Sequence, residues 1–205
     1  MAKRWQRRKD ARPPEILEAA LAVFAEKGFA ATRLDDVAAK AGITKGTIYL
    51  YFDSKQALFE ALARQSIGVQ IDQVTAQLAQ FPGSSSDLLR FVLGTMGNFA
   101  ITSDRVVLPR LVLAEAANFP QLAEFWRREV VERGIALMSG IIQRGIARGE
   151  FRKIDLQHAA RLCVAPLLVI VLWRTTFARF DAEPYDYQGL IDAHLATLLK
   201  GLEAP

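Results

Sequence analysis

The sequence predicts an all-α protein with an N-terminal three-helix domain, which contains a helix-turn-helix, and a larger helical C-terminal domain. Apolar residues recur at spacings of three and four along most of the chain, and no stretch alternates with the period of two that marks a half-buried strand. Apolar residues make up 51% of the 205 residues, which is enough for a substantial core. We therefore expect domains at residues 13–55 and 56–205, preceded by a basic arm at residues 1–12.

Charge is distributed unevenly along the chain. Residues 1–55 hold eleven Lys or Arg against seven Asp or Glu, and the remainder holds fifteen of each, so the whole formal net charge of +4 lies in the N-terminal part. A polyanionic partner such as double-stranded DNA is expected to dock there. Residues 1–12 carry Asp10 as their one acidic residue, which predicts a disordered arm that follows phosphates or enters the minor groove. A solubilising tail is an equal alternative.

The first helix is expected to form a third wall of the small N-terminal core. It should begin at Pro13 and Pro14, where a missing N–H does no harm, and end at Gly28. Its buried face should comprise Ile16, Leu17, Ala20, Leu21 and Phe24.

A helix-turn-helix is expected in the next segment. Thr32 is placed to cap a helix from Asp35 to Ala41, Gly42 should end that helix, and Thr44 should cap a second helix that runs towards Phe52. The polar side chains of the second helix favour entry into the major groove of DNA, whereas an ordinary helical hairpin with surface Lys and Tyr is the alternative. The apolar residues that would hold the two helices at a fixed angle are Val37, Ile43 and Ile48.

The stretch AGITKGTIYLYFDSKQALFEAL resembles the DNA-binding signature of the TetR family of bacterial repressors. The similarity extends back through PPEILEAALAVFAEKGFAATRLDDVA, so that it covers residues 13–62, and LVLAEAANFPQL also occurs in many relatives. The resemblance implies a homodimer, an N-terminal DNA-binding domain and a variable helical domain that binds a small effector. By position it places the DNA contacts on Thr32 or Arg33, Thr44, Lys45, Gly46, Thr47, Tyr49, Leu50, Tyr51 and Lys55. Tyr51 stands where many relatives carry His, and Leu50 would favour a thymine methyl group.

The remainder of the chain is predicted to be a series of longer helices. Ser54 should cap a long helix whose first turn carries Lys55, and residues 81–86 form the clearest loop. Helices are then expected at about 87–103, 105–117, 121–148 and 155–180, followed by a last helix with an unbroken apolar stripe. The last two helices have more apolar surface than one chain should need, which predicts a four-helix dimer interface. Its expected residues are Val164, Leu168, Leu190, Ile191, His194, Leu195 and Leu198. The alternative is that both helices pack wholly within the monomer.

The inward faces of the middle helices offer a site for the small-molecule effector that the resemblance implies. The candidate pocket residues are Val92, Met96, Phe99, Leu113 and Trp126. Their composition suggests a hydrophobic or aromatic ligand, with Arg90, Arg110 or Arg161 available if the ligand carries a carboxylate. Simple core packing is the competing interpretation for each residue of that set.

No enzymatic constellation is visible in the sequence, and we expect neither a cofactor nor a metal. His158 and His194 lack a carboxylate at a metal-binding helical spacing, and Cys163 sits in an apolar run, which predicts a buried, inert thiol. The apolar run at residues 162–173 is shorter than the roughly 20 residues that cross a membrane, so a cytoplasmic protein is expected. A ligand-responsive repressor is the leading hypothesis. The alternatives are an activator, an architectural DNA-binding protein without an effector, and an all-α enzyme with a vestigial helix-turn-helix.

Overall fold

The computed structural model describes the backbone of residues 2–204 and the side chains of residues 13–76, 78 and 80–204. Within these residues the chain is helical, apart from turns and one isolated antiparallel bridge between Phe151 and Glu203, which confirms the all-α prediction. The chain forms two compact units. The first unit comprises Met1–Ile67 and Val107–Trp126, and the second comprises Gly68–Val106 and Arg127–Pro205.

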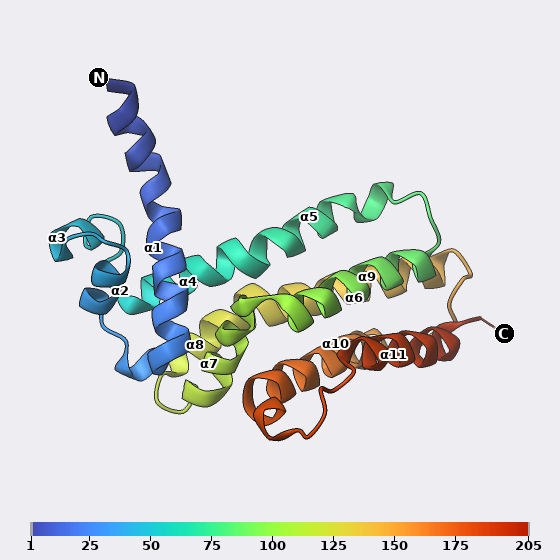
Figure 1. Cartoon of the computed structure of the whole chain (residues 1–205). Helices are drawn as coiled ribbons and strands as arrows, with labels where there is room; N and C mark the ends of the chain where they lie inside the picture. Colours follow the sequence, from blue (N-terminus) through green and yellow to red (C-terminus); the bar gives the residue numbers. More distant parts are fainter. Residues whose placement is uncertain (1, 205) are drawn as a thin grey trace. The chain divides into compact units, whose positions relative to one another are not determined.

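The first unit contains six helices among the described residues: α1 (Ala2–Ala31), α2 (Leu34–Lys40), α3 (Lys45–Ile48), α4 (Lys55–Ala63), α7 (Val107–Glu115) and α8 (Pro120–Trp126). Helix α1 packs against α2, α4 and α7, and α3 packs against α2 (Figure 1). The core of the first unit is rich in aromatic rings. Phe24, Phe29 and Phe59 are fully or almost fully buried and contact one another at centroid distances of 5.7–6.3 Å. Phe125 and Trp126 of α8 extend this cluster by contacting Phe59.

Helix α1 begins earlier than the sequence suggested. It runs from Ala2, so residues 2–12 are helical instead of forming an irregular arm, and Pro13 and Pro14 lie inside the helix. The reason is local: Ala, Lys, Arg and Gln, which dominate this segment, are good helix formers, and no glycine interrupts them. The expected end of the regular helix is confirmed, because Gly28 has φ +76° and ψ 175°.

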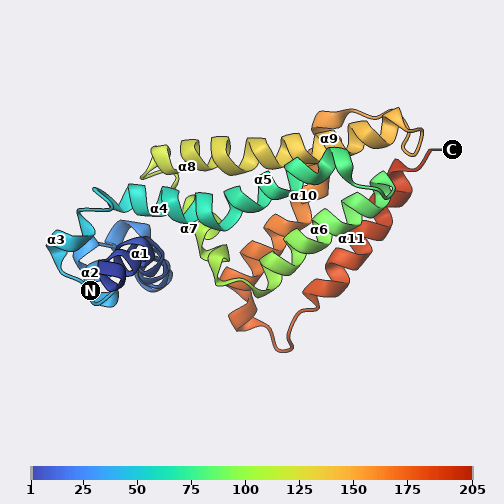
Figure 2. The same cartoon turned by 90° about the horizontal axis from the view of Figure 1, so that it is seen from above.

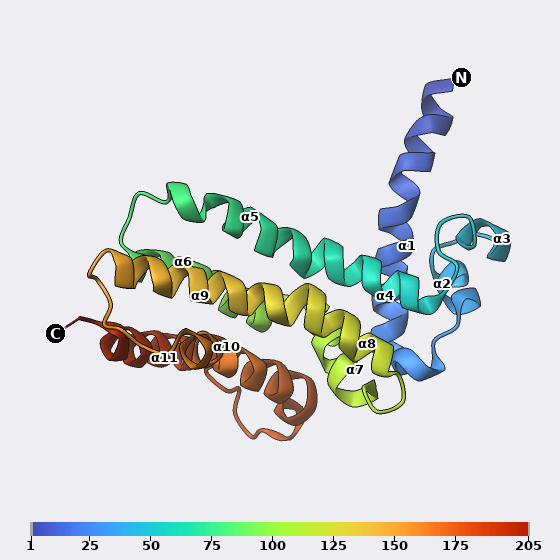
Figure 3. The ribbon, with the colours of Figure 1, turned by 180° about the vertical axis from the view of Figure 1, so that it is seen from behind.

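Among the described residues the second unit contains five α-helices: α5 (Val69–Gln77), α6 (Ser85–Thr102), α9 (Arg133–Ala147), α10 (Leu156–Leu172) and α11 (Tyr187–Leu202). Helix α10 packs against α6 and α9, and α11 packs against α6 and α10 (Figure 2). Helix α5 lies beside α9 (Figure 3). Gly97 allows the close approach of α6 to α11, since a Cβ there would lie only 3.0 Å from Cγ1 of Ile191.

Two helices that the sequence predicted to be continuous change their winding along their length. The segment expected at 121–148 consists of α8, a π-helical turn at Arg127–Glu132 and α9. The segment expected at 155–180 continues from α10 into a π-helical turn at Trp173–Phe177 and a 3₁₀ turn at Ala178–Phe180. Further turns of these kinds occupy Arg64–Gly68, Leu78–Gln80 and Asp104–Val106.

The loop between α5 and α6 lies where it was predicted and is fixed by one arginine. Arg144 of α9 donates to the carbonyl oxygens of Phe81 and Gly83, both at 2.9 Å, and to Oγ of Ser85 at 3.2 Å. Ser84 caps α6, since its Oγ accepts from the N–H of Asp87 at 3.0 Å.

The helical segment Leu156–Phe180 spans 25 residues and is, by length and composition alone, long and apolar enough to cross a membrane. The uninterrupted apolar run at residues 162–173 is only part of this helical segment, so the segment is longer than the run alone predicts. One third of its most apolar window is buried inside the structure.

Helix α10 exposes four large aliphatic side chains. We call them the α10 stripe: Leu162, Leu168, Val169 and Leu172.

Candidate nucleic-acid interface

The short helix α3 is locked at its beginning by the predicted cap. The side chain of Thr44 accepts from the N–H of Thr47 at 3.2 Å, and the two threonine hydroxyls lie 2.8 Å apart. Gly42 has φ +64°, which lets the chain turn sharply after α2, and the N–H of Ile43 donates to the carbonyl of Ala38 at 3.0 Å. Ile48 is completely buried, so it anchors the inner face of α3.

The cap of α2 differs from the expected one. Arg33, and not Thr32, precedes the helix, and its backbone N–H donates to Oδ2 of Asp36 at 3.2 Å. Thr32 is buried and its hydroxyl donates to the carbonyl of Gly28 at 2.6 Å, so it closes the turn after α1. A hydroxyl three residues before an acid is a common start signal for a helix, but here the end of the preceding helix competes for the same hydroxyl. Thr32 and Arg33 were the two alternatives for a DNA contact, and only Arg33 is exposed.

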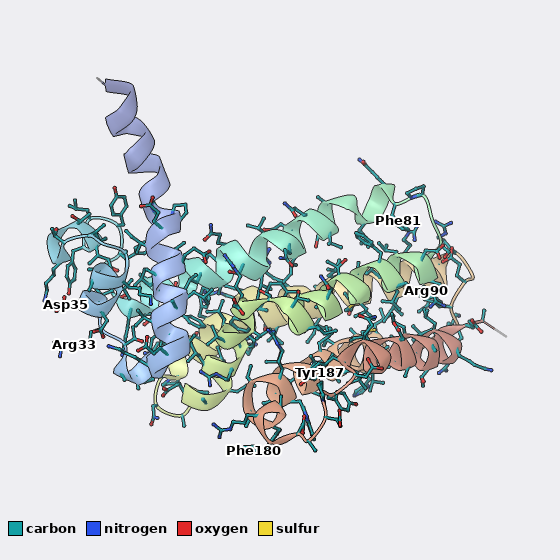
Figure 4. The ribbon with its side chains drawn as sticks, in the orientation of Figure 1. Arg33, Asp35, Phe81, Arg90, Phe180 and Tyr187 are labelled. Carbon is teal, nitrogen blue, oxygen red and sulfur yellow. The ribbon has the colours of Figure 1, made fainter. Side chains whose placement is uncertain are left out.

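Helix α3 and the turns on either side of it present most of the predicted DNA-contact residues. Leu50 is 80% exposed and Tyr49 is 48% exposed, so both side chains are accessible to a partner. Figure 4 labels Arg33 at the start of α2, the helix that packs against α3. The exposed or half-buried residues of this region, called the α3 surface below, are Arg33, Thr44, Lys45, Gly46, Thr47, Tyr49, Leu50 and Tyr51.

Lys55 has a different place from the one expected of it. Its ammonium donates to the carbonyl oxygens of Phe29 and Ala30, both at 2.8 Å, and lies 4.8 Å from the ring centroid of Phe29. The ring of Phe119 faces the same ammonium at 5.3 Å. Burial lowers the pKa of Lys55, and the charge of Glu115 partly opposes that shift. Lys55 therefore closes the end of α1 instead of projecting towards a phosphate, because the orphan carbonyls there attract the first turn of α4.

Sequence reasoning missed the residues that surround Lys55. The N–H of Ala30 donates to Oε1 of Glu115 at 3.3 Å, and the rings of Phe29 and Phe119 meet edge to face at 4.9 Å. Glu115 and Phe119 belong to the stretch LVLAEAANFPQL, whose recurrence in relatives was the one available signal.

Sequence reasoning also missed the partner of Lys45. Its Nζ donates to Oδ2 of Asp35 at 3.0 Å, and this hydrogen bond raises the pKa of Lys45. The neighbouring Asp36 pairs with Lys27 at 3.0 Å, and the hydrogen bond from Lys27 lowers the pKa of Asp36. The signal in the sequence was the presence of two acids inside a basic segment.

The five candidate pocket residues are divided between the two units. Val92 is buried in the core of the second unit, and Met96 packs against that core as a partly buried residue. Phe99 is half-buried on the same helix. Leu113 and Trp126 belong to the first unit, where Leu113 is half exposed and Trp126 contacts Phe59.

The candidate interface residues fall into two groups. Ile191 and Leu195 are buried in the core of the second unit, so their expected role at a surface is corrected: they hold α11 within its own chain. Leu168 belongs to the exposed α10 stripe. Val164, Leu190 and Leu198 are half-buried, and His194 places Nε2 3.0 Å from the carbonyl oxygen of Cys163.

Comparisons with known proteins agree with this geometry. Residues 16–62 match the family described as bacterial regulatory proteins, tetR family, and residues 84–184 match the tetracyclin repressor-like C-terminal domain, so that the two matches together cover more than half of the chain. The chain is 28% identical over 205 residues to the HTH-type transcriptional repressor KstR2 of Rhodococcus jostii, covering 96% of this chain and 94% of that protein. It is 24% identical over 189 residues to the fatty acid metabolism regulator protein of Bacillus subtilis, covering 92% and 94%.

A solved structure shares the fold along almost its whole length. The transcriptional regulator FadR from Bacillus subtilis in complex with stearoyl-CoA has a TM-score of 0.73 and 22% identity, covering 92% of this chain and 98% of that one. The family matches, together with a helix-turn-helix whose second helix is capped, anchored and outwardly polar, lead to one conclusion. The chain belongs to the TetR family of bacterial regulatory proteins and is a DNA-binding transcriptional regulator.

Proposed function

We propose that the protein is a homodimeric repressor that binds a palindromic operator through the α3 surface and leaves it when an apolar effector binds the second unit. The observation that carries the DNA-binding part is the exposure of Lys45 at the start of α3 and of Tyr49 and Leu50 in the turn that follows it, while Ile48 anchors the helix. An exposed leucine is well suited to a thymine methyl group, and a lysine and a tyrosine hydroxyl to phosphates or base edges.

The choice of a repressor is supported by the relatives, of which KstR2 carries that description. An activator would use the same surface and differ only in where its operator lies relative to the promoter. An architectural protein would lack any ligand response. The protein would act in the cytoplasm, where bacterial DNA lies.

The homodimer is supported by the α10 stripe. Four large aliphatic side chains on the same helix are exposed, with Leu162 the most exposed of them at 60%. A contiguous apolar surface of this kind is typical of a protein–protein interface. Two copies of α3 would then enter successive major grooves about 34 Å apart, which requires a near-palindromic operator.

The effector is proposed to be a long apolar molecule such as a fatty acyl thioester. Among the relatives, one is described as a fatty acid metabolism regulator, and a structure of the same fold holds stearoyl-CoA. The apolar lining would come from the inward side of α6, where Val92, Met96 and Phe99 lie. Arg90, exposed on the same helix, is the nearest candidate in the sequence for an anionic group of the ligand.

The test uses fluorescence anisotropy with an operator selected from random duplexes by repeated binding to the wild-type protein. Lys45→Ala should weaken operator binding and reduce the slope of log affinity against log salt by about one, because one phosphate contact is lost. Tyr49→Ala should reduce discrimination among operator variants if the hydroxyl reaches a base. Unchanged affinity in both variants would exclude α3 as the DNA-reading helix.

The effector part is tested with stearoyl-CoA and with coenzyme A as the matched control without the acyl chain. Stearoyl-CoA should raise the melting temperature and lower operator affinity, because linkage requires the two effects to occur together. A ligand that stabilises the protein yet leaves operator affinity unchanged contradicts the coupling. The absence of any shift with stearoyl-CoA contradicts the acyl assignment.

A further inference from the structure

Asp35 is an acidic residue next to a surface that otherwise offers cations and hydrogen-bonding groups to DNA. It lies in the first turn of α2 and binds Lys45, the first residue of α3, through a 3.0 Å hydrogen bond that links the two helices. The side chain of Lys45 is 64% exposed and that of Asp35 is 44% exposed, so solvent and DNA can reach the pair. The ammonium of Lys45 is thus held by the protein before DNA arrives.

The carboxylate of Asp35 is only partly satisfied. Its Oδ2 accepts the hydrogen bond from Lys45, whereas Oδ1 is buried and has no hydrogen-bond partner. A buried polar atom without a partner costs free energy, so the fold alone gives little reason for a carboxylate here. Asp36 already caps α2 through its Oδ2, so the helix does not need Asp35 for that purpose either.

We propose that Asp35 restrains Lys45 and thereby determines specificity, by suppressing binding to non-operator DNA more than binding to the operator. This inference rests on the proposed contact between Lys45 and an operator phosphate. Asp35 acts through Lys45 and is a positioning residue, not a DNA contact.

The mechanism is an exchange of partners. In a loose complex on non-operator DNA the phosphates have no fixed place relative to α3, so Lys45 keeps Asp35 and the pair has no net charge. When α3 is seated closely on the operator, a phosphate oxygen is held within hydrogen-bond distance of the ammonium and replaces the carboxylate. Lys45 therefore contacts a phosphate only in the complex with the operator.

The exchange predicts different salt dependences for the two kinds of DNA. Each phosphate contact contributes about 0.9 to the slope of log affinity against log salt. In Asp35→Asn the ammonium of Lys45 is no longer neutralised by a carboxylate, so the slope on non-operator DNA should rise by about 0.9. For two proteins that bind equally at 1 M salt, this corresponds to about eightfold tighter binding by the variant at 0.1 M salt. The slope on the operator should stay nearly constant, because Lys45 contacts a phosphate there in both proteins.

Asp36→Asn is the matched control. Both aspartates lie in the first turn of α2, both pair with a lysine at 3.0 Å, and both substitutions remove one negative charge. The ion-pair partner of Asp36 is Lys27 of α1, which is outside the α3 surface, and the side-chain oxygen of an asparagine can still accept from the N–H of Arg33. The control should therefore change the affinity for operator and non-operator DNA by similar, small factors.

The experiment measures anisotropy from low to moderate salt on the selected operator and on a duplex of equal length and composition with a shuffled sequence. Asp35→Asn should lower the ratio of operator to non-operator affinity several-fold, and this loss should vanish in the Lys45→Ala background. Equal changes on both DNAs, or an effect that persists without Lys45, would overturn the proposal. Circular dichroism on each variant confirms that it is folded.

The design separates this inference from the proposed function. If Lys45→Ala weakens operator binding but Asp35→Asn leaves the affinity ratio unchanged, the restraint is wrong and the DNA-reading role of α3 stands. If Lys45→Ala has no effect on operator binding, the proposed role of Lys45 itself fails, and the restraint fails with it.

Discussion

At the scale of single residues, Cys163 and His194 form a contact between two helices. Cys163 is completely buried in α10, and burial raises the pKa of its thiol from 9.0 to about 12. Its carbonyl oxygen lies 3.0 Å from Nε2 of His194, and because a carbonyl only accepts, Nε2 must carry the proton. This contact joins α10 to α11 through a polar group inside an apolar region.

The raised pKa of Cys163 predicts an unreactive thiol and a loss of stability at high pH. The unfolded thiol ionises near pH 9 and the folded one near pH 12, so the unfolded state releases its proton first and stability falls as the pH rises between these values. At pH 8 the native protein should react with a disulfide reagent far more slowly than the protein in concentrated guanidinium chloride. Equal rates in the two states would mean that the thiol is accessible. Cys163→Ser, which has no thiol, gives the background signal.

At the scale of elements, most signals that depend on neighbours in sequence predict the structure correctly, and the cap of α2, which is Arg33 and not Thr32, is the exception. Thr44 and Ser54 cap α3 and α4, and Gly42 ends α2 with a positive φ. Such features follow from one residue and the backbone within three positions of it. The hydrogen bonds of Lys55 could not be predicted this way, because its acceptors lie 25 and 26 residues earlier in the chain.

The end of α9 depends on a glycine that no local signal identified. Phe151 folds back onto Gly145, and the N–H of Phe151 donates to the carbonyl of Gly145 at 3.1 Å. The N–H of the next residue, Arg152, donates to the carbonyl of Leu202 at 2.9 Å, which ties this turn to the end of α11. A Cβ on Gly145 would overlap the ring of Phe151, so the packing requires glycine at this position.

Gly145→Ala should therefore destabilise the protein by about 1–3 kcal/mol, the usual cost of forcing extra volume into a packed core. The matched control is Gly94→Ala in α6, where no atom lies within 4 Å of an added Cβ. That change should stabilise the protein by about 0.4–1 kcal/mol, since alanine lowers the entropy of the unfolded chain. Urea denaturation measures both, and a Gly145→Ala protein as stable as the wild type would show that the Phe151 ring can move aside.

At the scale of the whole molecule, the two compact units differ from the single division that the sequence suggested at residue 55. The first unit also takes in Val107–Trp126, because Phe119, Phe125 and Trp126 pack on Phe29 and Phe59. The chain passes between the units at Ile67, Val106 and Trp126, and each passage lies in or beside a π-helical or 3₁₀ turn. Apolar periodicity alone could not reveal this, because all these segments have helical spacing.

Apolar periodicity also could not tell which face of a helix its own chain covers. The regular apolar stripe on α11 predicts an interface, yet Ile191 and Leu195 fill the core between α11 and its neighbours. The exposed apolar face belongs to α10, whose sequence is apolar nearly all round and therefore shows no preferred direction. The proposed dimer thus depends on the α10 stripe.

Two substitutions distinguish an effect on dimerisation from an effect on folding. Val169 is 51% exposed, so Val169→Glu leaves the carboxylate in water in the monomer and should preserve folding, but a dimer would have to bury that charge. We expect a folded monomer by sedimentation and circular dichroism, with greatly weakened operator binding, because each α3 would then bind its half-site alone. Leu195→Glu would instead place the charge inside the second unit and should unfold it. A Val169→Glu protein that remains dimeric would show that the α10 stripe is not the interface, and a wild-type protein that sediments as a monomer would contradict the dimer itself.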